Sequence, residues 1–368
     1  MSVRDRLGMT PVQATSAWLL VFAIGGLAGI GALLICMYLL TFGGSDSVDK
    51  HGISEVEASR IGGVAIVIYM ALHLGYQYQL NESPQITNGV YVMAIALSYF
   101  AIGFFEDMQG SLGARLRFVL MLAIAAVALS LTSELALAPV GILLVDWLVA
   151  TPVTAVIFTT ICIAFLPNAF NTADGANGLV SGITLLALTG LIEVAPPSLA
   201  PYLSACIVGC LIFLVFNIIS GRFFLGDGGA YFLGTFCGVA LILIANQSDV
   251  STWWLLSLIF YPAADLLFSM IRRGLAGGSV VQADNLHLHN LLFALINGKI
   301  RAAYWSNTMT GVGIALFFSG VPLILQKLEL LSLNSSLWLW VVLAQWAVYG
   351  LAWRFASRRI CALSETGA

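Results

Sequence analysis

The chain of 368 residues is 60% hydrophobic and only 9% charged, with a mean hydropathy of +0.97. This balance excludes a soluble globular domain and predicts an all-α, polytopic membrane protein. The formal net charge of −3 says little about partners, and the six cysteines have no metal-ligand spacing, so we interpret them as buried thiols.

About eleven apolar segments are long enough to cross a bilayer when a window of about 20 residues is moved along the chain. They lie near residues 16–42, 61–80, 89–105, 115–132, 152–167, 179–195, 202–220, 229–246, 253–271, 303–325 and 336–356. The apolar segment 135–150 contains Pro139 and Asp146, so we expect it at the membrane interface. The first segment is too long for a cleaved signal. We expect residues 1–368 to form one integral-membrane domain, with a motif-bearing core over about 60–290.

Basic residues predict how these spans are oriented. If the C-terminus and the loops 43–60, 106–115, 168–178, 221–228 and 272–302 are cytoplasmic, twelve Lys and Arg residues lie inside and three outside. The inside group is Lys50, Arg60, Arg115, Arg117, Arg222, Arg272, Arg273, Lys299, Arg301, Arg354, Arg358 and Arg359, and the outside group is Arg4, Arg6 and Lys327. The positive-inside rule then places the N-terminus outside and the C-terminus in the cytoplasm.

Two motifs come early in the chain. Residues 59–63, SRIGG, place Arg60 at a helix start beside paired glycines, although alone Arg60 is explained as a positive-inside anchor. Residues 103–117, GFFEDMQGSLGARLR, end an apolar helix with the adjacent acids Glu106 and Asp107. Neighbouring like charges at a membrane surface are costly unless they share a cation or a proton. We therefore favour a site over a solvated helix end, which is the alternative interpretation.

A third motif, residues 167–179 with the sequence PNAFNTADGANGL, is the most polar junction between two apolar segments. On a helix, Asn168, Asn171 and Asp174 share an arc of about 120°. Gly175 and Gly178 then interrupt the helix and allow a ligand to approach the backbone. This pattern favours a polar site over a solvated loop.

Two further motifs lie in the second half of the chain. In residues 216–234, FNIISGRFFLGDGGAYFLG, Asp227 stands among glycines before an apolar helix, where backbone N–H groups favour an anion. Asp227 could instead cap that helix. In residues 283–290, ADNLHLHN, His287 and His289 alternate and share a face of an extended loop, which suits a diphosphate or a carboxylate-held metal but not a zinc site. Carboxylates, amides, Arg and His together favour phosphoryl transfer.

In this order the motifs resemble those of the polyprenyl-phosphate N-acetylhexosamine-1-phosphate transferases, which form glycosyltransferase family 4. The resemblance covers the chain from about Arg60 to Asn290. Its elements are RxGG at Arg60, the acidic pair with Arg115 and Arg117, NAxNxxDGxxGL from Asn168 to Leu179, GDxG at Asp227 and HxH at His287 and His289. The likeness is to the undecaprenyl-phosphate GlcNAc-1-phosphate transferases, since the histidine-rich signature of the peptidoglycan translocase is missing.

The resemblance implies an Mg²⁺-dependent reaction, with Mn²⁺ as an alternative ion, in which UDP-N-acetylhexosamine and undecaprenyl phosphate give a lipid-diphosphate sugar and UMP. It implies a bacterial inner-membrane enzyme that starts a surface polysaccharide such as O-antigen, with a bilayer but no nucleic acid as partner, and a homodimer is a further expectation. Asp227 would be the magnesium ligand, with Asp107 as a second candidate. The implied catalytic residues are Glu106, Asp107, Asp174 and Asp227, and the implied substrate-binding residues are Arg60, Asn168, Asn171, Asn217, Phe224, His287 and His289. Of these, Asn217 and Phe224 match positions that contact the uracil base in relatives.

The chain departs from the family pattern at four positions, which are Glu106, Asn177, Asn285 and Asn290. The first keeps the charge of the usual Asp, whereas the others replace an acid, an Arg and a His. Two other classes of protein fit the sequence less well. A CDP-alcohol phosphotransferase would need a multi-aspartate DGxxAR motif, which the sequence lacks. A transporter of a sugar nucleotide or lipid-linked sugar should place polar groups near mid-membrane, where only His73 and Asp265 are candidates.

Overall fold

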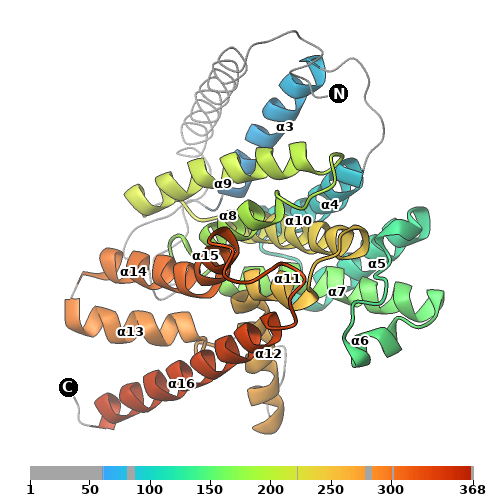
Figure 1. Ribbon diagram of the computed structural model, residues 1–368. Coiled ribbons are helices and arrows are strands. Elements are labelled where there is room, and N and C mark those ends of the chain that lie inside the picture. Colours follow the sequence, from blue (N-terminus) through green and yellow to red (C-terminus); the bar gives the residue numbers. More distant parts are fainter. Residues whose placement is uncertain are drawn as a thin grey trace.

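The computed structural model describes residues 60, 62–80, 88–221, 223–277, 284–300 and 302–365, and the elements of these segments are helical (Figure 1). The helices are α3 (Gly62–Leu80), α4 (Asn88–Gln109), α5 (Ala114–Leu131), the 3₁₀ turn η1 (Ser133–Leu135), α6 (Leu143–Leu148), α7 (Pro152–Ala173), α8 (Leu179–Leu191), α9 (Ala200–Ser220), α10 (Gly226–Gln247), α11 (Thr252–Leu258), α12 (Phe260–Leu275), α13 (Leu288–Ile300), α14 (Ala303–Ala315), the π-helical turn η2 (Leu316–Gly320), α15 (Val321–Lys327) and α16 (Trp338–Glu365).

The expected all-α membrane fold is confirmed. Within the described residues, seven helices are long and apolar enough to cross a membrane, and the bent pair α11–α12 makes up to eight. The shorter apolar helices α3 and α8 coincide with the expected segments 61–80 and 179–195. The expected first span, 16–42, lies outside the described residues. Segment 135–150 contains only the end of η1 and α6, both too short to span a bilayer.

Helix α10 lies at the centre of the bundle and packs against α3, α4, α7 and α8 (Figure 1). Every residue from Gly228 to Ile244 is buried. Glycine allows these helices to touch backbone to backbone, since a Cβ at Gly63 would lie 2.3 Å from the Cα of Gly229 and one at Gly103 would lie 2.5 Å from the carbonyl of Asp227. The glycine-rich stretch at the start of α10 therefore serves close helix packing.

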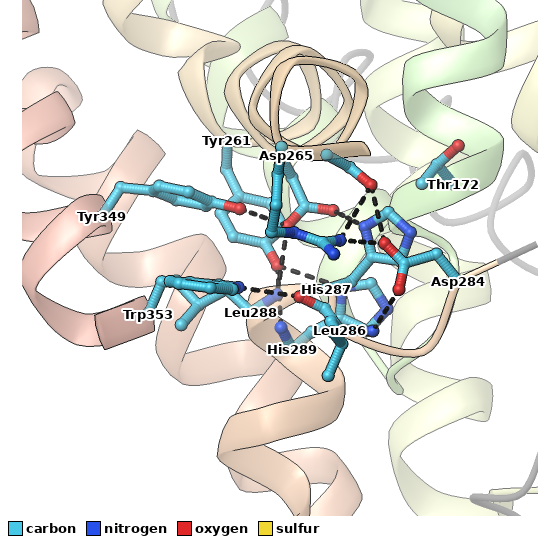
Figure 2. Close-up of polar contacts among 12 residues, drawn as sticks. Thr172, Tyr261, Asp265, Asp284, Leu286, His287, Leu288, His289, Tyr349 and Trp353 are labelled. Carbon is cyan, nitrogen blue, oxygen red and sulfur yellow. Dashed lines mark hydrogen bonds and ion pairs between the residues drawn. The ribbon is translucent and has the colours of Figure 1, made fainter. Parts of the chain in front are cut away.

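The pair α11–α12 is bent by 83° at Ile259. Pro262 has no N–H to offer the carbonyl of Leu258, and that carbonyl accepts a hydrogen bond from Ser319 Oγ at 2.6 Å instead. The carbonyl of Ser257 likewise accepts from Gln345 Nε2 at 3.0 Å. The break is thus hydrogen-bonded by η2 and α16, as a broken helix inside a membrane requires. The bend directs α12 toward the segment that carries His287 and His289, which packs against it (Figure 2).

Candidate active site

The start of α10 is capped by a side chain from another helix. Asp107, near the end of α4, accepts the backbone N–H of Asp227 at 3.0 Å on one carboxylate oxygen and that of Gly228 at 2.9 Å on the other. Leu225, which precedes α10, makes no side-chain cap. Gly226 has a φ of +72°, and a Cβ there would lie 2.6 Å from Asp107 Oδ2, so the approach depends on glycine. The carboxylate supplies the negative charge that a helix N-terminus favours.

Because Asp107 is the cap, the side chain of Asp227 does not serve that purpose. It forms an ion pair with Arg117 of α5, and the same guanidinium lies 3.9 Å from Glu106. Glu106 also accepts the backbone N–H of Leu112 at 2.7 Å, which ties down the turn between α4 and α5. Nε of Arg117 is buried without a hydrogen-bond partner in the described part of the chain. Arg117 therefore bridges two acids and still has an edge that can donate to an anion.

Arg60 and Asp174 complete this cluster of charges. The guanidinium of Arg60 lies 3.8 Å from Asp107. Asp174 follows the last residue of α7, and burial together with the negative charges of Asp227 and Asp107 raises its pKa to about 8, against the opposing charge of Arg60. Three acids from α4, α7 and α10 are thus close enough to repel one another. A bound cation would relieve this repulsion.

The two asparagines of α7 point to different partners. The helix continues to Ala173, so the expected helical arc from Asn168 to Asp174 is present. Asn171 donates to the hydroxyl of Tyr231, one turn after Asp227, at 3.3 Å. Asn168 donates instead to the carbonyl of Ala164 in its own helix, at 2.8 Å. Asn171 is therefore tied to the start of α10, whereas the amide of Asn168 is bonded within α7.

Asn217 connects the turn after α7 with the segment before α10. Its Oδ1 accepts the backbone N–H of Gly178 at 2.6 Å, and its Nδ2 donates to the carbonyl of Phe223 at 2.6 Å. Asn177 lies beside it, with its backbone N–H bonded to Asn307 Oδ1 at 2.6 Å. Both amides are buried and used internally. The amide at position 177, where relatives were expected to have an acid, suits this neutral network.

Phe224, the other residue expected to contact a base, is half-buried before the start of α10. Its carbonyl accepts the backbone N–H of Gly62 at 2.8 Å, and the next carbonyl, of Leu225, accepts that of Gly63 at 3.0 Å. These bonds join the RxGG segment to the GDxG segment.

The two histidines lie at the start of α13 and not in an extended loop, with His287 just before the helix and His289 in its first turn. His289 Nε2 would lie 2.5 Å from a Cβ on Gly175, so the ring sits directly over the turn that follows Asp174. His287 Nδ1 lies 2.7 Å from Asp265 Oδ2, and His289 Nδ1 lies 3.0 Å from the hydroxyl of Tyr261 (Figure 2). Burial lowers the pKa of His289 to about 4, against the attraction of the Asp265 carboxylate, so this imidazole is neutral at pH 7.

Asp284 holds the segment that leads to the histidines. Its carboxylate accepts the backbone N–H of Leu286 and the hydroxyl of Ser269, both at 2.9 Å, and pairs with Arg272 (Figure 2). Burial opposes the charge, but these three donors together keep the pKa of Asp284 below its usual value. Trp353 of α16 adds a hydrogen bond to the carbonyl of Leu286 at 2.8 Å.

Six of the expected site residues therefore meet around the start of α10 and the turn after α7, namely Arg60, Glu106, Asp107, Asn171, Asp174 and Asp227. Sequence reasoning did not assign a role to the residues that position the site. These are Tyr231, which bonds Asn171, and a group around the two histidines, namely Tyr261, Asp265, Arg272, Asp284 and Tyr349. Most of these lie inside apolar spans, where only a buried charge such as Asp265 gives a signal in the sequence.

The oxygen donors of this cluster suit Mg²⁺. No group of three or more His, Cys, Asp or Glu side chains in the described residues is arranged to hold a metal ion by itself. Mg²⁺, however, is usually held by one or two carboxylates, with substrate phosphates and water as the remaining ligands. Burial is the main cause of the raised pKa of Asp174, and the added repulsion from Asp227 and Asp107 is the further sign that a cation fits here.

Comparison with known proteins agrees with this arrangement. Residues 89–245 match the model of glycosyl transferase family 4. Over 278 residues the chain is 27% identical to a decaprenyl-phosphate N-acetylglucosaminephosphotransferase of Mycolicibacterium smegmatis, covering 66% of this chain and 67% of that protein. It is 28% identical over 290 residues to a phospho-N-acetylmuramoyl-pentapeptide-transferase of Pelotomaculum thermopropionicum, and these residues cover 72% of this chain and 85% of that protein.

A third relative is a probable undecaprenyl-phosphate N-acetylglucosaminyl 1-phosphate transferase of Bacillus subtilis, 25% identical over 268 residues, which cover 69% of this chain and 71% of that protein. The chain spans about two thirds of the length of the mycobacterial relatives, 65% of that from Mycobacterium tuberculosis. The matched region contains the acidic pair, the Asn/Asp motif and the start of α10. Over residues 89–245 the chain is therefore similar to glycosyl transferase family 4.

Proposed function

We propose that this protein transfers a sugar 1-phosphate from a UDP-N-acetylhexosamine to undecaprenyl phosphate and releases UMP. An oxygen of the lipid phosphate attacks the sugar-linked phosphorus, a new P–O bond forms, and the P–O bond to UMP breaks with its electron pair on UMP. The observation that carries the proposal is the meeting of Asp107, Asp174 and Asp227 with Arg60 and Arg117 at one helix start. Phosphoryl transfer depends mainly on such positioning and charge neutralisation.

In this proposal each charged residue has a separate task. Asp107 fixes the start of α10, and through it the position of Asp227. Asp227, with Asp107 as a second candidate, would hold Mg²⁺, which neutralises the charge of the diphosphate when it is bound. Arg117, whose Nε has no partner in the described residues, and Arg60 would bind phosphate oxygens.

Asn217 enters the proposal as a positioning residue. Because both ends of its amide are bonded to backbone, it supports the nucleotide site by joining Gly178 to Phe223. Phe224 offers a ring for stacking on the uracil. Asn171 lines the reaction centre through Tyr231, and Asn168 remains a proposed contact that would have to leave its bond to Ala164.

The names of the relatives differ in the lipid and in the sugar. The absence of the translocase's histidine-rich signature favours N-acetylhexosamine transfer, and we place the enzyme in a bacterial inner membrane, where it would start a lipopolysaccharide or related surface polymer. A transporter of the same substrates is the second candidate, favoured by the intramembrane Asp265. The buried bonds of Asp265 to His287, Leu288 and Tyr349 explain that residue without a transport pathway.

A transfer assay with purified protein tests the proposal. Radiolabelled UDP-sugars are supplied one at a time with undecaprenyl phosphate and Mg²⁺ or Mn²⁺, and lipid-linked label and UMP are measured together. The expected result is equal release of UMP and formation of lipid-linked label with one or a few N-acetylhexosamines. Binding of UDP-sugar without UMP release would support the transporter and reject the transferase.

The metal role has its own variant. Asp227→Asn should lower transfer by about 10²–10³-fold, because the neutral amide loses the charge that would hold Mg²⁺ and pair with Arg117. Asp249→Asn is the matched control, since Asp249 is exposed just beyond the other end of α10. If Asp227→Asn keeps activity within a few fold of Asp249→Asn, the metal assignment is wrong.

A further inference from the structure

The hydrogen bonds of His289 determine which of its ring nitrogens carries the proton. The hydroxyl of Tyr261 accepts the backbone N–H of His289 at 3.1 Å and also lies 3.0 Å from His289 Nδ1 (Figure 2). Tyr261 is buried, and its hydroxyl has no other partner among the described residues. Its single proton must therefore be donated to Nδ1, since a buried donor without an acceptor is costly. His289 is left with its proton on Nε2, the nitrogen that lies over Gly175.

His287 has the opposite arrangement. Its Nδ1 lies 2.7 Å from Asp265 Oδ2, and the other oxygen of that carboxylate accepts the hydroxyl of Tyr349 at 2.7 Å and the backbone N–H of Leu288 at 3.2 Å. A carboxylate only accepts hydrogen bonds, so Nδ1 of His287 must carry a proton, and Nε2 is then the nitrogen that can offer a lone pair. The two rings are nearly parallel, at 12°, with centroids 5.6 Å apart.

We propose that Asp265 and Tyr261 are positioning residues that hold His287 and His289 in opposite tautomers. The two histidines then present one hydrogen-bond acceptor and one donor to the substrate diphosphate and its sugar. Neither Nε2 has a hydrogen-bond partner in the described part of the chain, so both remain available to a ligand. His289 Nε2–H, beside the turn after Asp174, donates to a phosphate oxygen. His287 Nε2 accepts from a hydroxyl or amide N–H of the donor substrate.

The substrate contacts assigned to the two histidines rest on the proposed transferase function, but the assignment of their tautomers does not. They follow from the bonds of two residues of α12, Tyr261 and Asp265, and from Tyr349 of α16. Two equivalent, positively charged histidines would be the simpler expectation for a diphosphate site. The geometry assigns them different tasks instead.

Nitrogen-15 NMR measures the tautomers directly and without any substrate. The protein is labelled at histidine in a His51→Gln, His73→Gln background, which leaves His287 and His289 as its only histidines. The two signal sets are assigned by replacing each remaining histidine with Gln. At pH 7.5 we expect protonated Nδ1 in His287 and protonated Nε2 in His289. The same tautomer in both rings, or a His287 ring that carries protons on both nitrogens, would reject the proposal, whether or not the protein is a transferase.

Asp265→Asn provides the second readout. The Asn oxygen can keep the bonds to Tyr349 and Leu288, and its NH₂ group then faces His287 Nδ1, so we expect His287 to change to the Nε2–H tautomer while His289 is unchanged. Tyr349→Phe is the matched control, because it removes one bond to the same carboxylate but leaves the acceptor for Nδ1. An unchanged His287 tautomer in folded Asp265→Asn would refute the positioning role. If this variant does not fold, the wild-type spectrum still tests whether the two histidines have opposite tautomers.

Activity then separates positioning from stability. In the transfer assay, Asp265→Asn should lower kcat/KM by about tenfold or more, because His287 Nε2 then presents a proton to the substrate instead of a lone pair. Tyr349→Phe should lower kcat/KM by a smaller factor. Equal losses in the two variants, with equal thermal stability, would contradict a role for the tautomer. If no variant and no wild-type sample transfers sugar phosphate while the spectra agree with expectation, the proposed function fails and the tautomer assignment stands.

Discussion

Glu106 and Asp107 are neighbours with different bonds. Both carboxylate oxygens of Asp107 accept backbone N–H groups of α10, whereas Glu106 accepts a single N–H, from Leu112, and lies near Arg117. An Asn at position 107 would turn its NH₂ group toward one of two N–H donors, so the start of α10 could not keep its place. A Gln at position 106 could still accept from Leu112.

We therefore predict that Asp107→Asn lowers transfer by about 10²–10³-fold. Glu106→Gln should cost no more than about tenfold, since a partly exposed ion pair contributes about 1 kcal/mol or less. Rates measured from pH 6 to 9 should show a constant defect for Asp107→Asn, because the lost function is positioning. A defect that disappears at high pH would indicate that Asp107 acts as a base. A larger loss in Glu106→Gln would reverse the assignment of roles.

The neutral, buried His289 predicts how stability depends on pH. Its pKa is about 4 in the folded protein and about 6.5 in an unfolded chain. Between these pH values the unfolded chain binds a proton that the folded protein does not, so stability is lost as the pH falls from 6.5 toward 4. The expected loss is about 1.4 kcal/mol for each pH unit. Above pH 6.5 the residue adds no pH dependence.

Thermal unfolding in detergent checks this prediction. The Tm of the wild type should fall more steeply between pH 6.5 and 4.5 than that of His289→Gln, whose side chain cannot titrate. Other groups titrate in both proteins, so the difference in slope isolates His289. Parallel curves would mean that the imidazole is not buried in its neutral form.

At the scale of helices, glycine contacts hold the site together. Gly63→Ala should destabilise the protein and reduce activity, because its Cβ would lie 2.3 Å from the backbone of Gly229 and would separate α3 from α10. Gly75→Ala in the same helix is the matched control, since nothing lies within 4 Å of its Cβ position. The measurements are Tm and transfer rate. Equal behaviour of the two variants would show that α3 and α10 are not in contact at Gly63.

Helices and motifs were largely predictable from the sequence, because an apolar window of about 20 residues and a polar interruption are local signals. The ten expected spans that fall on described residues all correspond to apolar helices or, for α11–α12, a bent pair. The partners of the polar residues were not predictable. Asp107 caps a helix 120 residues away, and Asp265 meets a tyrosine 84 residues away. Such pairings depend on how helices pack, which hydropathy does not encode.

Asn217 illustrates the same limit. Its position in the family pattern suggested a contact to the base, and only the fold places its amide between the backbones of Gly178 and Phe223. The bend of α12 depends in part on Pro262, a local signal, but the groups that bond the freed carbonyls come from Ser319 and Gln345. The sequence analysis treated residues 253–271 as one span and did not predict the break, and tertiary packing explains how the membrane tolerates it.

For the whole molecule, the orientation in the membrane is still a prediction, and α16 offers a test. Cys361 near its end should react with a membrane-impermeant maleimide only from the cytoplasm. Ser336→Cys, placed just before α16 in a Cys361→Ser background, should react only from outside, since Ser336 is exposed at the opposite end. Intact cells and inverted vesicles provide the two conditions. The reverse labelling pattern would place the charge cluster outside the cell and contradict the use of a cytoplasmic nucleotide sugar.

The contacts of α16 also affect the order in which the site is assembled during synthesis. Tyr349 holds Asp265, and Trp353 holds the carbonyl of Leu286, yet both follow the residues that they support by more than sixty positions. A ribosome delivers α4, α7 and α10 to the membrane first, so their charges can meet before the histidine segment is secured. The site therefore gains its histidines in their final setting only when α16 has entered the bilayer. Until then the nascent chain has the charged cluster but not the secured histidine segment.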